Sequence, residues 1–349
     1  MPAWVARSGF ESHHLGVIRV YHPMTHLEKV MTVKLGVVMD PISEITVKKD
    51  STLAMLLAAQ ARGWSLHYME MKDLYLRDGM CHGRMADLIV RDDARDWFDL
   101  GESQTRLLSD LDVILMRKDP PFDMEFIYAT YLLEQAEQAG VLVVNKPQSL
   151  RDANEKVFTA WFPQCCPPTL VTREISRLYE FLAIEKEIIV KPLDGMGGAS
   201  IFRVTEGEAN TNVIFETMTR HESRFIMAQR FLPEIRDGDK RVLLVNGEPV
   251  PYALARVPAE GDARGNLAAG ATGVGVELSE RMVWIAGEIG PVVKEKGLML
   301  VGLDVIGDHV TEINVTSPTC IRELDGFYGL DIAGQLMDAI ETKLQASGR

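Results

Sequence analysis

The segment KPLDGMGGASI, residues 191–201, connects two apolar, strand-like runs. The first run, EIIVK, ends at Lys191, and the second run, SIFRV, begins at Ser200. The glycines of the segment, Gly195, Gly197 and Gly198, are typical of backbone that lies against phosphate groups. The Walker loop and the dinucleotide fingerprint both require a helix directly after the glycines, and no helix-forming run follows here. The segment therefore predicts a glycine-rich hairpin, which either folds over a triphosphate or is a mobile turn.

The composition limits the classes of protein to which the chain can belong. A length of 349 residues exceeds what one hydrophobic core usually serves, so we expect two or three packed subdomains. The net charge of −13 argues against nucleic acid as a partner. No apolar run has the length of a membrane span, no secretory signal is apparent, and the four cysteines have no CxxC spacing. These features predict a cytoplasmic protein without a membrane partner.

Strand-like and helix-like runs alternate from Val33 to Lys146, which predicts an open α/β layer with a largely parallel sheet. Strands are expected at 33–39, 65–70, 112–116 and 141–144, and helices at 50–62 and 123–139. The first strand is followed by MDPISEI instead of a glycine fingerprint, so this half is not expected to bind a dinucleotide. Residues 1–30 are expected to be a poorly ordered extension, or to follow a start codon placed too early.

After Pro147 the pattern becomes α+β. It predicts a helix at 151–161, a strand at 225–229, and a hairpin of strands at 241–245 and 249–256 that turns at Asn246-Gly247. The stretch Val257–Gly273 is longer than most loops in compact domains, so it is either disordered or a functional lid. We favour a lid, because Arg264 and Asn266 lie among glycines and could close over an anion.

Residues 298–319 predict two strands joined by a three-residue turn at Gly307–His309. This register places Asp304 opposite Glu312, with Asn314 on the same face of the sheet. Two carboxylates on an apolar strand face need a compensating cation. Their oxygen ligands suit Mg²⁺ or Mn²⁺, and the alternative is a core network in which Arg or Lys pairs with them.

Basic residues fall where a triphosphate would need positive charge. Lys156 follows QSLRDANE, Lys191 ends the strand before the glycines, and Arg256 precedes the long loop. Each of them taken singly is more typical of a surface charge. Arg241 opens an otherwise apolar strand and is expected to face a site. No nucleophile elbow or Cys-His pair is apparent, so covalent catalysis is not indicated.

The order of these motifs resembles that of the ATP-grasp superfamily, and within it the bacterial glutathione synthetases, from about Lys34 to near the C-terminus. The segments that carry the resemblance are MDPI (39–42), MRKDPPFD (116–123), NKPQSLRDANEK (145–156), KPLDGMGGASIFRV (191–204), GDKRVL (238–243), RGNLAAG (264–270) and TEINVTSPT (311–319). The resemblance implies an N-terminal α/β domain at 31–150 and an ATP-grasp domain at 151–349. The latter would consist of a lid subdomain at about 151–232 and a metal-bearing subdomain at about 233–349.

The resemblance also implies a function: ligation of γ-glutamylcysteine to glycine through an acyl phosphate, with ATP consumed to ADP and phosphate, in a homo-oligomer. Another ATP-grasp carboxylate-amine ligase, or a non-catalytic nucleotide-binding module, remains the alternative. The residues implied to bind ATP are Lys156, Lys191, Asp194, Gly195, Gly197, Gly198, Gln229, Arg230, Phe231 and Leu232. Those implied to bind Mg²⁺ or Mn²⁺ are Asp304, Glu312 and Asn314. The implied catalytic residues are Arg241, Arg256 and Arg264, and the implied substrate-binding residues are Arg117, Asn266, Ser317 and Thr319.

Overall fold

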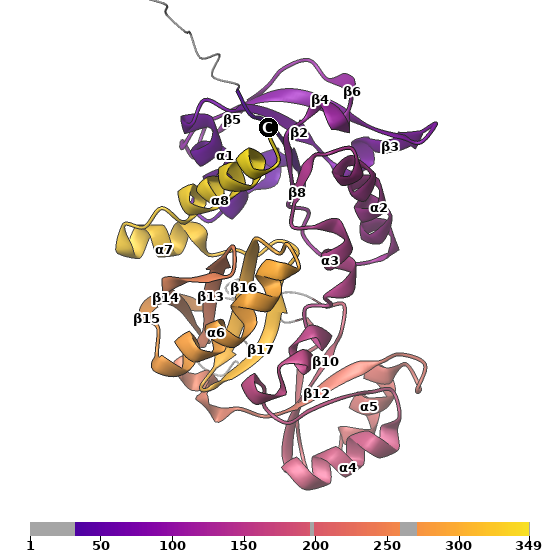
Figure 1. Cartoon of the computed structure of the whole chain (residues 1–349). Helices are drawn as coiled ribbons and strands as arrows, with labels where there is room; N and C mark the ends of the chain where they lie inside the picture. The colour runs from indigo at the N-terminus through magenta and orange to yellow at the C-terminus, as the bar shows by residue number, and fades with distance from the viewer. Residues whose placement is uncertain (1–31, 196–198, 259–270, 349) are drawn as a thin grey trace, which may run out of the picture. The chain divides into compact units, whose positions relative to one another are not determined.

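The computed structural model describes residues 32–195, 199–258 and 271–348. The extension expected at residues 1–30 lies outside this part of the chain. Within the described part the strands form three sheets, and helices pack on each of them (Figure 1). None of the helices in these ranges combines the length and the apolar character that crossing a bilayer requires.

The first sheet has the parallel centre that the alternating pattern predicted. Its strand order is β3-β4-β2-β1-β7-β8. The parallel strands are β1 (Lys34–Val38), β2 (Ser65–Met69), β7 (Val113–Met116) and β8 (Leu142–Val144), and the helices that connect them are α1 (Ser51–Ala61) and α2 (Met124–Gln138). Each helix begins after an aspartate whose carboxylate accepts a backbone N–H, Asp50 from Leu53 at 2.6 Å and Asp123 from Phe126 at 3.0 Å. These caps explain why the helices start where the sequence indicated.

Four antiparallel strands extend the first sheet beyond the predicted elements. They are β3 (Leu74–Arg77), β4 (Met80–Val90), β5 (Phe98–Leu100) and β6 (Gln104–Leu107). The long strand β4 pairs with all three others and with β2. The short edge strands β3, β5 and β6 are largely exposed, so they lack the continuous apolar run from which the central strands were identified.

The helix predicted at residues 151–161 is wrong, because the chain forms two shorter pieces. Helix α3 (Pro147–Asp152) ends first, and a short 3-10 helix (Val157–Trp161) follows. Between them the side-chain oxygen of Asn154 accepts the backbone N–H groups of Lys156, at 3.1 Å, and Val157, at 3.0 Å. This local bond competes with the helical ladder, so Lys156 lies at a break in the chain.

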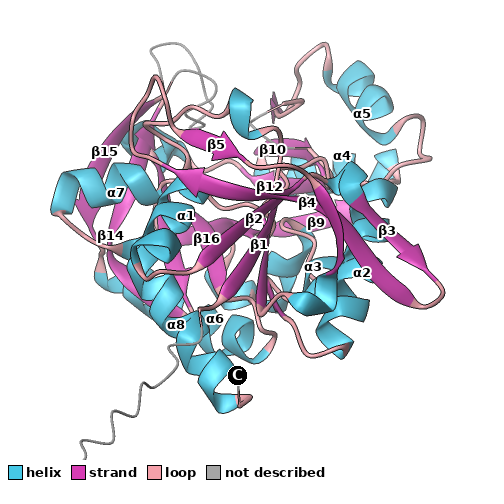
Figure 2. Ribbon diagram, turned by 90° about the horizontal axis from the view of Figure 1, so that it is seen from above, coloured by secondary structure: helices cyan, strands magenta, loops and turns pink. Residues whose placement is uncertain are grey.

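The second sheet contains the glycine-rich segment. Its strand order is β11-β10-β12-β9, and all of its pairs are antiparallel. The strands are β9 (Thr169–Thr172), β10 (Glu187–Pro192), β11 (Phe202–Thr205) and β12 (Ile226–Arg230), and the helices are α4 (Ile175–Glu185) and α5 (Thr211–Thr219). Both helices pack on this sheet through one apolar cluster (Figure 2). Since the glycine-rich segment joins β10 to β11, the strand-to-strand prediction is confirmed.

The third sheet is antiparallel, with the order β15-β14-β13-β16-β17. Its strands are β13 (Asp239–Val245), β14 (Glu248–Val257), β15 (Thr272–Glu277), β16 (Leu300–Ile306) and β17 (His309–Asn314), and α6 (Glu280–Glu295) packs on it. The predicted turn between β13 and β14 is confirmed, with positive φ at both Asn246 (50°) and Gly247 (86°). Two such residues match the twist that a tight hairpin requires.

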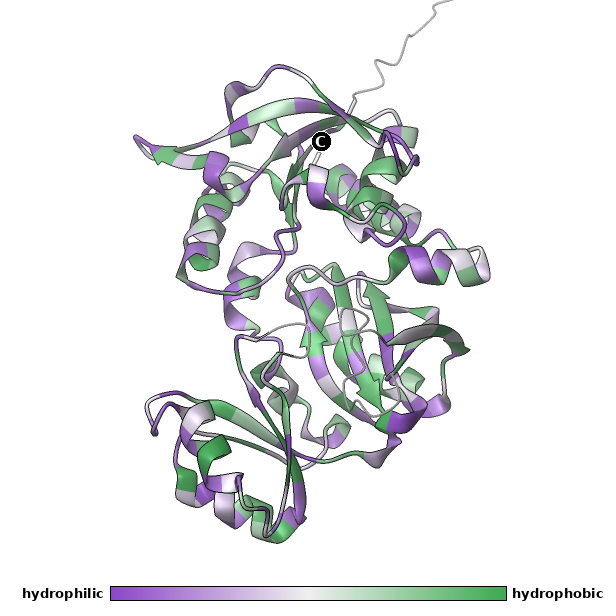
Figure 3. Ribbon diagram, turned by 180° about the vertical axis from the view of Figure 1, so that it is seen from behind, coloured by the Kyte–Doolittle hydropathy of each residue, from purple (hydrophilic) through white to green (hydrophobic). Residues whose placement is uncertain are grey.

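The last two helices, α7 (Ile321–Tyr328) and α8 (Ile332–Ala346), return to the first sheet. Helix α8 packs along α1 (Figure 1), and Arg62 of α1 contacts Asp338 of α8 at 2.6 Å. One apolar cluster joins α1 and α8 to strands of the first and third sheets. Figure 3 shows hydrophobic residues on the strands of the third sheet, where this core continues.

A close backbone contact between α6 and the β13–β14 turn allows a paired test of the fold. A Cβ atom added at Gly290 would overlap the carbonyl oxygen of Gly247, whereas one added at Gly287 would meet nothing within 4 Å. We expect Gly290→Ala to lower the unfolding free energy by about 1–3 kcal/mol. Gly287→Ala, on the exposed face of the same helix, should raise it by about 0.5–1 kcal/mol. Urea denaturation measures both, and equal stabilities would contradict the contact.

Candidate active site

The strands β16 and β17 place the predicted metal ligands together. Asp304 pairs with Glu312, and Gly302 pairs with Asn314, so the predicted opposition is confirmed. The predicted three-residue turn is wrong, because His309 already belongs to β17 and pairs with Ile306. A register shift between Asp304 and Val305 supplies the missing residue, since a bulge lets two residues of one strand face one of the other.

Asp304 is the centre of a buried network of charges. Its carboxylate accepts Arg241 Nε at 2.5 Å and Nη2 at 3.2 Å, and Arg256 Nη2 lies 3.0 Å from it. Burial acts to raise the pKa of Asp304, but the attraction of the two arginines outweighs it and holds this pKa well below its usual range. The ionised form of Asp304 is therefore favoured at neutral pH. The alternative of a core network with arginine describes this carboxylate correctly, and it does not exclude a metal ion as a further partner.

Asp239, which the sequence analysis did not single out, completes this network. Its carboxylate accepts a hydrogen bond from Arg256. Burial raises the pKa of Asp239 to about 6, although the charge of Arg256 acts in the opposite direction. Its Oδ1 and the Nε of Arg256 are buried without a hydrogen-bond partner. The feature of the sequence that could have identified Asp239 as a site residue is its place two positions before Arg241 in the GDKRVL segment.

Two lysines converge on Glu312. The Nζ atoms of Lys156 and Lys191 each lie 3.5 Å from Glu312 Oε1. Lys156 also donates to the carbonyl of Gly195 at 2.7 Å, and Lys191 donates to the carbonyl of Thr311 at 3.1 Å. Burial lowers the pKa of Lys191, and the charge of Glu312 opposes this shift. Both side chains are 5% exposed, so the interpretation as surface charges is wrong for them.

The predicted adenine-side residues lie at the end of β12 and directly after it, and β12 belongs to the second sheet with Lys191. Gln229 is buried and donates to Thr169 Oγ1 at 3.1 Å. The guanidinium of Arg203 lies over the ring of Phe231, 4.0 Å from its centroid. In the register of this sheet Gln229 and Arg230 face Ile189 and Ile188 of β10. Leu232 is buried, while Asp194, in the glycine-rich segment, pairs with Arg224.

The predicted substrate-binding residues that the structure describes come from two distant parts of the chain. Arg117 donates from Nε to Thr52 Oγ1 at 3.1 Å and from Nη2 to the carbonyl of Pro318 at 2.9 Å. Ser317 Oγ donates to the carbonyl of Arg117 at 3.3 Å. Burial lowers the pKa of the Arg117 guanidinium, and no carboxylate of a described residue hydrogen-bonds to it. A buried cation in this condition suits an anionic ligand.

Four predicted site residues, Gly197, Gly198, Arg264 and Asn266, lie outside the described residues. The described ends of the expected lid are the last residues of β14 and the first of β15.

The donor set fits a hard divalent ion. Asp304 is ionised, and Asn314 donates its amide nitrogen to the carbonyl of Gly302 at 3.2 Å, which leaves its amide oxygen as the ligand atom. Oxygen-only sets of this kind suit Mg²⁺ or Mn²⁺. Across residues 32–195, 199–258 and 271–348, no group of three or more His, Cys, Asp and Glu side chains is placed to hold a metal. An ion at this position would therefore depend on the amide of Asn314 as well as on the two carboxylates.

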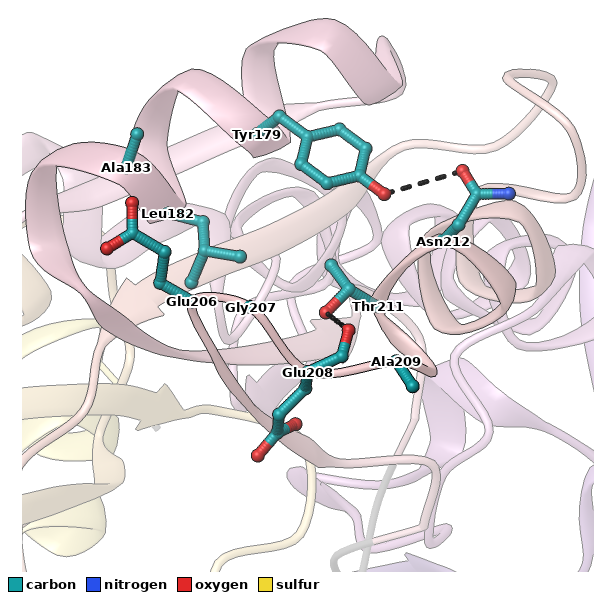
Figure 4. Close-up of a pocket in the computed structure, with 9 residues that line it drawn as sticks. All are labelled: Tyr179, Leu182, Ala183, Glu206, Gly207, Glu208, Ala209, Thr211 and Asn212. Atoms are coloured by element: carbon teal, nitrogen blue, oxygen red, sulfur yellow. Dashed lines mark hydrogen bonds between the residues drawn. The ribbon is translucent and has the colours of Figure 1, made fainter.

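A separate cavity of about 390 Å³ lies between α4, α5 and the turn after β11 (Figure 4). Tyr179 of α4 donates to Asn212 of α5 across its rim at 3.5 Å. None of the predicted site residues lines it.

Two family models match the chain. The model of the prokaryotic glutathione synthetase N-terminal domain matches residues 33–151, and that of the prokaryotic glutathione synthetase ATP-grasp domain matches residues 155–329. Among curated proteins, the glutathione synthetase of Pseudomonas aeruginosa is 64% identical over 316 residues, which cover 90% of this chain and 100% of the relative. That of Escherichia coli strain K12 is 61% identical over 313 residues, covering 90% and 99% of the two chains.

Solved structures show the same fold at low sequence identity. The D-cycloserine synthetase DcsG matches with a TM-score of 0.65 at 14% identity, covering 89% of this chain and 99% of that one. The ATP-grasp ligase PsnB, complexed with minimal precursor, Mg and ADP, matches with a TM-score of 0.57 at 17% identity, covering 89% and 98%. These likenesses confirm the fold class.

The raised pKa of Asp239 predicts a pH dependence of stability. Between about pH 4, where an ordinary carboxyl titrates, and about pH 6, the folded protein holds a proton that the unfolded chain has released. The unfolding free energy should therefore fall as the pH rises through this window, by on the order of 3 kcal/mol at most.

Asp239→Asn should reduce this fall by the contribution of Asp239, because the amide does not titrate. Thermal unfolding between these two pH values, without divalent ions, measures the slope. Asp237→Asn, at an exposed neighbouring position, is the control and should keep the wild-type slope. An unchanged slope in Asp239→Asn would show that this carboxyl is not the titrating group.

Proposed function

The chain belongs to the prokaryotic glutathione synthetase family, and we propose that it joins γ-L-glutamyl-L-cysteine to glycine, with ATP consumed to ADP and phosphate. The observation that carries this function is the identity of 64% with a glutathione synthetase whose whole length the chain covers. The geometry supports it, because Lys156 and Lys191 converge on one carboxylate and Lys156 also binds the glycine-rich segment, as a site for a triphosphate and its metal ion requires.

The proposed ATP site lies between the second and third sheets. Lys156 and Lys191 would neutralise phosphate oxygens, and the segment that contains Gly195 would offer backbone N–H groups to them. The adenine would border Gln229 to Leu232, at the end of β12. Asp304, Glu312 and Asn314 would hold Mg²⁺ or Mn²⁺, which supplies positive charge to the transferred phosphoryl group when it is bound. This placement rests on the family motifs and on the contacts of the two lysines.

The proposed reaction has two steps. The cysteinyl carboxylate attacks the terminal phosphorus of ATP, ADP leaves, and an acyl phosphate forms. The amine of glycine then attacks the acyl carbon, and phosphate leaves. Arg241 and Arg256 are held by Asp304 with their guanidinium groups in the network, where they would stabilise the charge that develops on phosphoryl and acyl oxygens. Arg264 and Asn266 remain predictions from the motif RGNLAAG.

The dipeptide and glycine are proposed to lie near Arg117 and the segment Ser317–Thr319. Arg117 is a buried cation whose described partners are neutral oxygens, so a substrate carboxylate would supply the missing charge. The proposed division of the chain is an α/β domain at 31–150 and an ATP-grasp domain at 151–349, with lid and metal-bearing parts that meet near residue 232. From family membership we also propose a cytoplasmic homo-oligomer without nucleic-acid or membrane partners.

Identification of the product by mass tests the function. The protein, incubated with ATP, Mg²⁺, γ-glutamylcysteine and glycine, should form glutathione and release ADP only when both substrates are present. ADP release with D-alanine in place of these substrates would assign the chain to another carboxylate-amine ligase branch. A protein that binds ATP and forms no product would be a non-catalytic nucleotide-binding module.

Glu312→Gln tests the proposed metal site. The amide removes one anionic ligand, and we expect turnover to fall by at least about 100-fold because the metal loses its charge balance. Circular dichroism should show an unchanged fold. Glu248→Gln, at the exposed start of β14 in the same sheet, is the matched control and should retain turnover. Full activity of Glu312→Gln would refute the metal assignment.

A further inference from the structure

The second step of the proposed reaction needs a proton acceptor. Glycine carries an ammonium group at neutral pH, so its nitrogen has no lone pair to attack the acyl carbon until a proton leaves. A carboxylate close to the acyl oxygens, and free of other cations, would serve as this acceptor. The inference below rests on the proposed function, since it concerns the same site.

Of the carboxylates in the proposed site, three are paired with cations. Asp304 holds Arg241 and Arg256, Asp239 also binds Arg256, and Glu312 lies between two lysines. These three must remain with their partners, because separating a buried ion pair leaves an uncompensated charge. They are therefore poor candidates for a group that gains and loses a proton in every turnover.

Glu323 differs from the other three. It has no ion pair with any residue of the described ranges, and its Oε2 atom is buried without a hydrogen-bond partner. Burial raises the pKa of this carboxyl, while its own backbone N–H acts to lower it. A buried, unpartnered carboxylate oxygen binds a proton or an N–H donor more readily than a solvated one.

The position of Glu323 connects the substrate segment to the arginine network. It is the third residue of α7, which begins two residues after Thr319, and α7 is fixed at its start by the bond from Ile321 N to Ser51 Oγ at 3.2 Å. Cys320, three residues before Glu323, is buried, and the charges of Arg241 and Arg256 act to lower the pKa of its thiol while burial raises it.

The charged groups that act on the carboxyl of Glu323 come from three elements. They are Lys49 before α1, Arg241 of β13, and Arg322 of α7 itself. Arg322 is directed to Asp92, at 2.6 Å. Arg241 is the group that we place at the acyl oxygens, and its positive charge acts on the carboxyl of Glu323.

We propose that Glu323 takes the proton from the ammonium group of the incoming glycine and so produces the amine that attacks the acyl phosphate. The nitrogen lone pair forms the C–N bond, and the C–O bond to phosphorus breaks with its electron pair on phosphate. The second proton of the amine leaves to the phosphate, which departs as hydrogen phosphate. Glu323 then returns its proton to water, and no further reactant is needed.

The test compares two nucleophiles, glycine and hydroxylamine, that differ in protonation near neutral pH. Hydroxylamine is a neutral nucleophile near neutral pH and attacks an acyl phosphate without prior loss of a proton. In Glu323→Gln we expect kcat/KM for glycine to fall by about 100-fold and the rate of hydroxamate formation to change by less than about 3-fold. The difference between wild type and variant with glycine should shrink as the pH rises, because solution then supplies the free amine.

Three controls separate a proton-transfer role from a structural one. Positional isotope exchange in ATP, with γ-glutamylcysteine and no glycine, reports the first step and should be unchanged in Glu323→Gln. Glu295→Gln, at an exposed position of α6, should show the wild-type rates with both glycine and hydroxylamine. Glu323→Asp keeps a carboxylate and should retain more glycine-dependent activity than Glu323→Gln.

Equal losses with glycine and hydroxylamine in either Glu323 variant, or full glycine-dependent activity of Glu323→Gln, would overturn the proposal. The same would follow if the deficit with glycine did not change with pH. Failure of the wild-type protein to form glutathione would instead overturn the proposed function, so the two outcomes are distinguishable.

Discussion

The site depends on the placement of Asp304 between two arginines in the middle of the third sheet. All three side chains are buried, and a buried anion of this kind is tolerated only when its partners approach it with good geometry. The antiparallel register supplies that geometry, since Arg241 faces Asp304 directly across β13 and β16. Gly302 is part of the same arrangement, because a side chain at this position would meet Cδ and the guanidinium nitrogens Nε and Nη1 of Arg241. The network therefore fixes both the register of the sheet and the direction of two guanidinium groups.

Glu312 has the corresponding role between the sheets. Its two lysine partners come from the break after α3 and from β10 of the second sheet, while Glu312 itself belongs to the third sheet. One carboxylate thus links three segments that are far apart in the sequence. Each lysine also donates to a backbone carbonyl, so its position is fixed by more than the ion pair. The charges that a triphosphate requires are held in place by contacts within the protein.

Much of this architecture was predictable where local chemistry determines it. The parallel strands of the first sheet, the capped helices and the Asn246-Gly247 turn follow from apolar runs, N-cap aspartates and residues that accept positive φ. The opposition of Asp304 and Glu312 was also correct, although the turn and the bulge that produce it were not foreseen. A shorter turn and one extra strand residue give the same register, and the sequence pattern does not distinguish these two solutions.

The remaining features depend on contacts between residues that are distant in the sequence, or on polar side chains that compete with backbone hydrogen bonds. The side chain of Asn154 interrupts a segment whose composition suits a helix. Asn145 provides a similar example, because its side chain bonds Leu300 and Val315, more than 150 residues away. Partners of this kind have no signature in the sequence beyond the presence of a polar residue in an apolar setting. Glu323 also had no local signal, since its character follows from the residues that surround it.

The packing of α8 on α1 affects the order in which the protein can fold during synthesis. Domains usually fold as units, beginning with the N-terminal one, as the chain leaves the ribosome. Here the apolar surface of α1 is completed by residues near the C-terminus, among them Leu336 and Ile340. The first sheet can form early, but its helical layer is closed only after nearly the whole chain has been made. The helical layer of the N-terminal part is therefore incomplete until α8 has been made. Until then the apolar face of α1 is exposed, and the nascent chain must protect it.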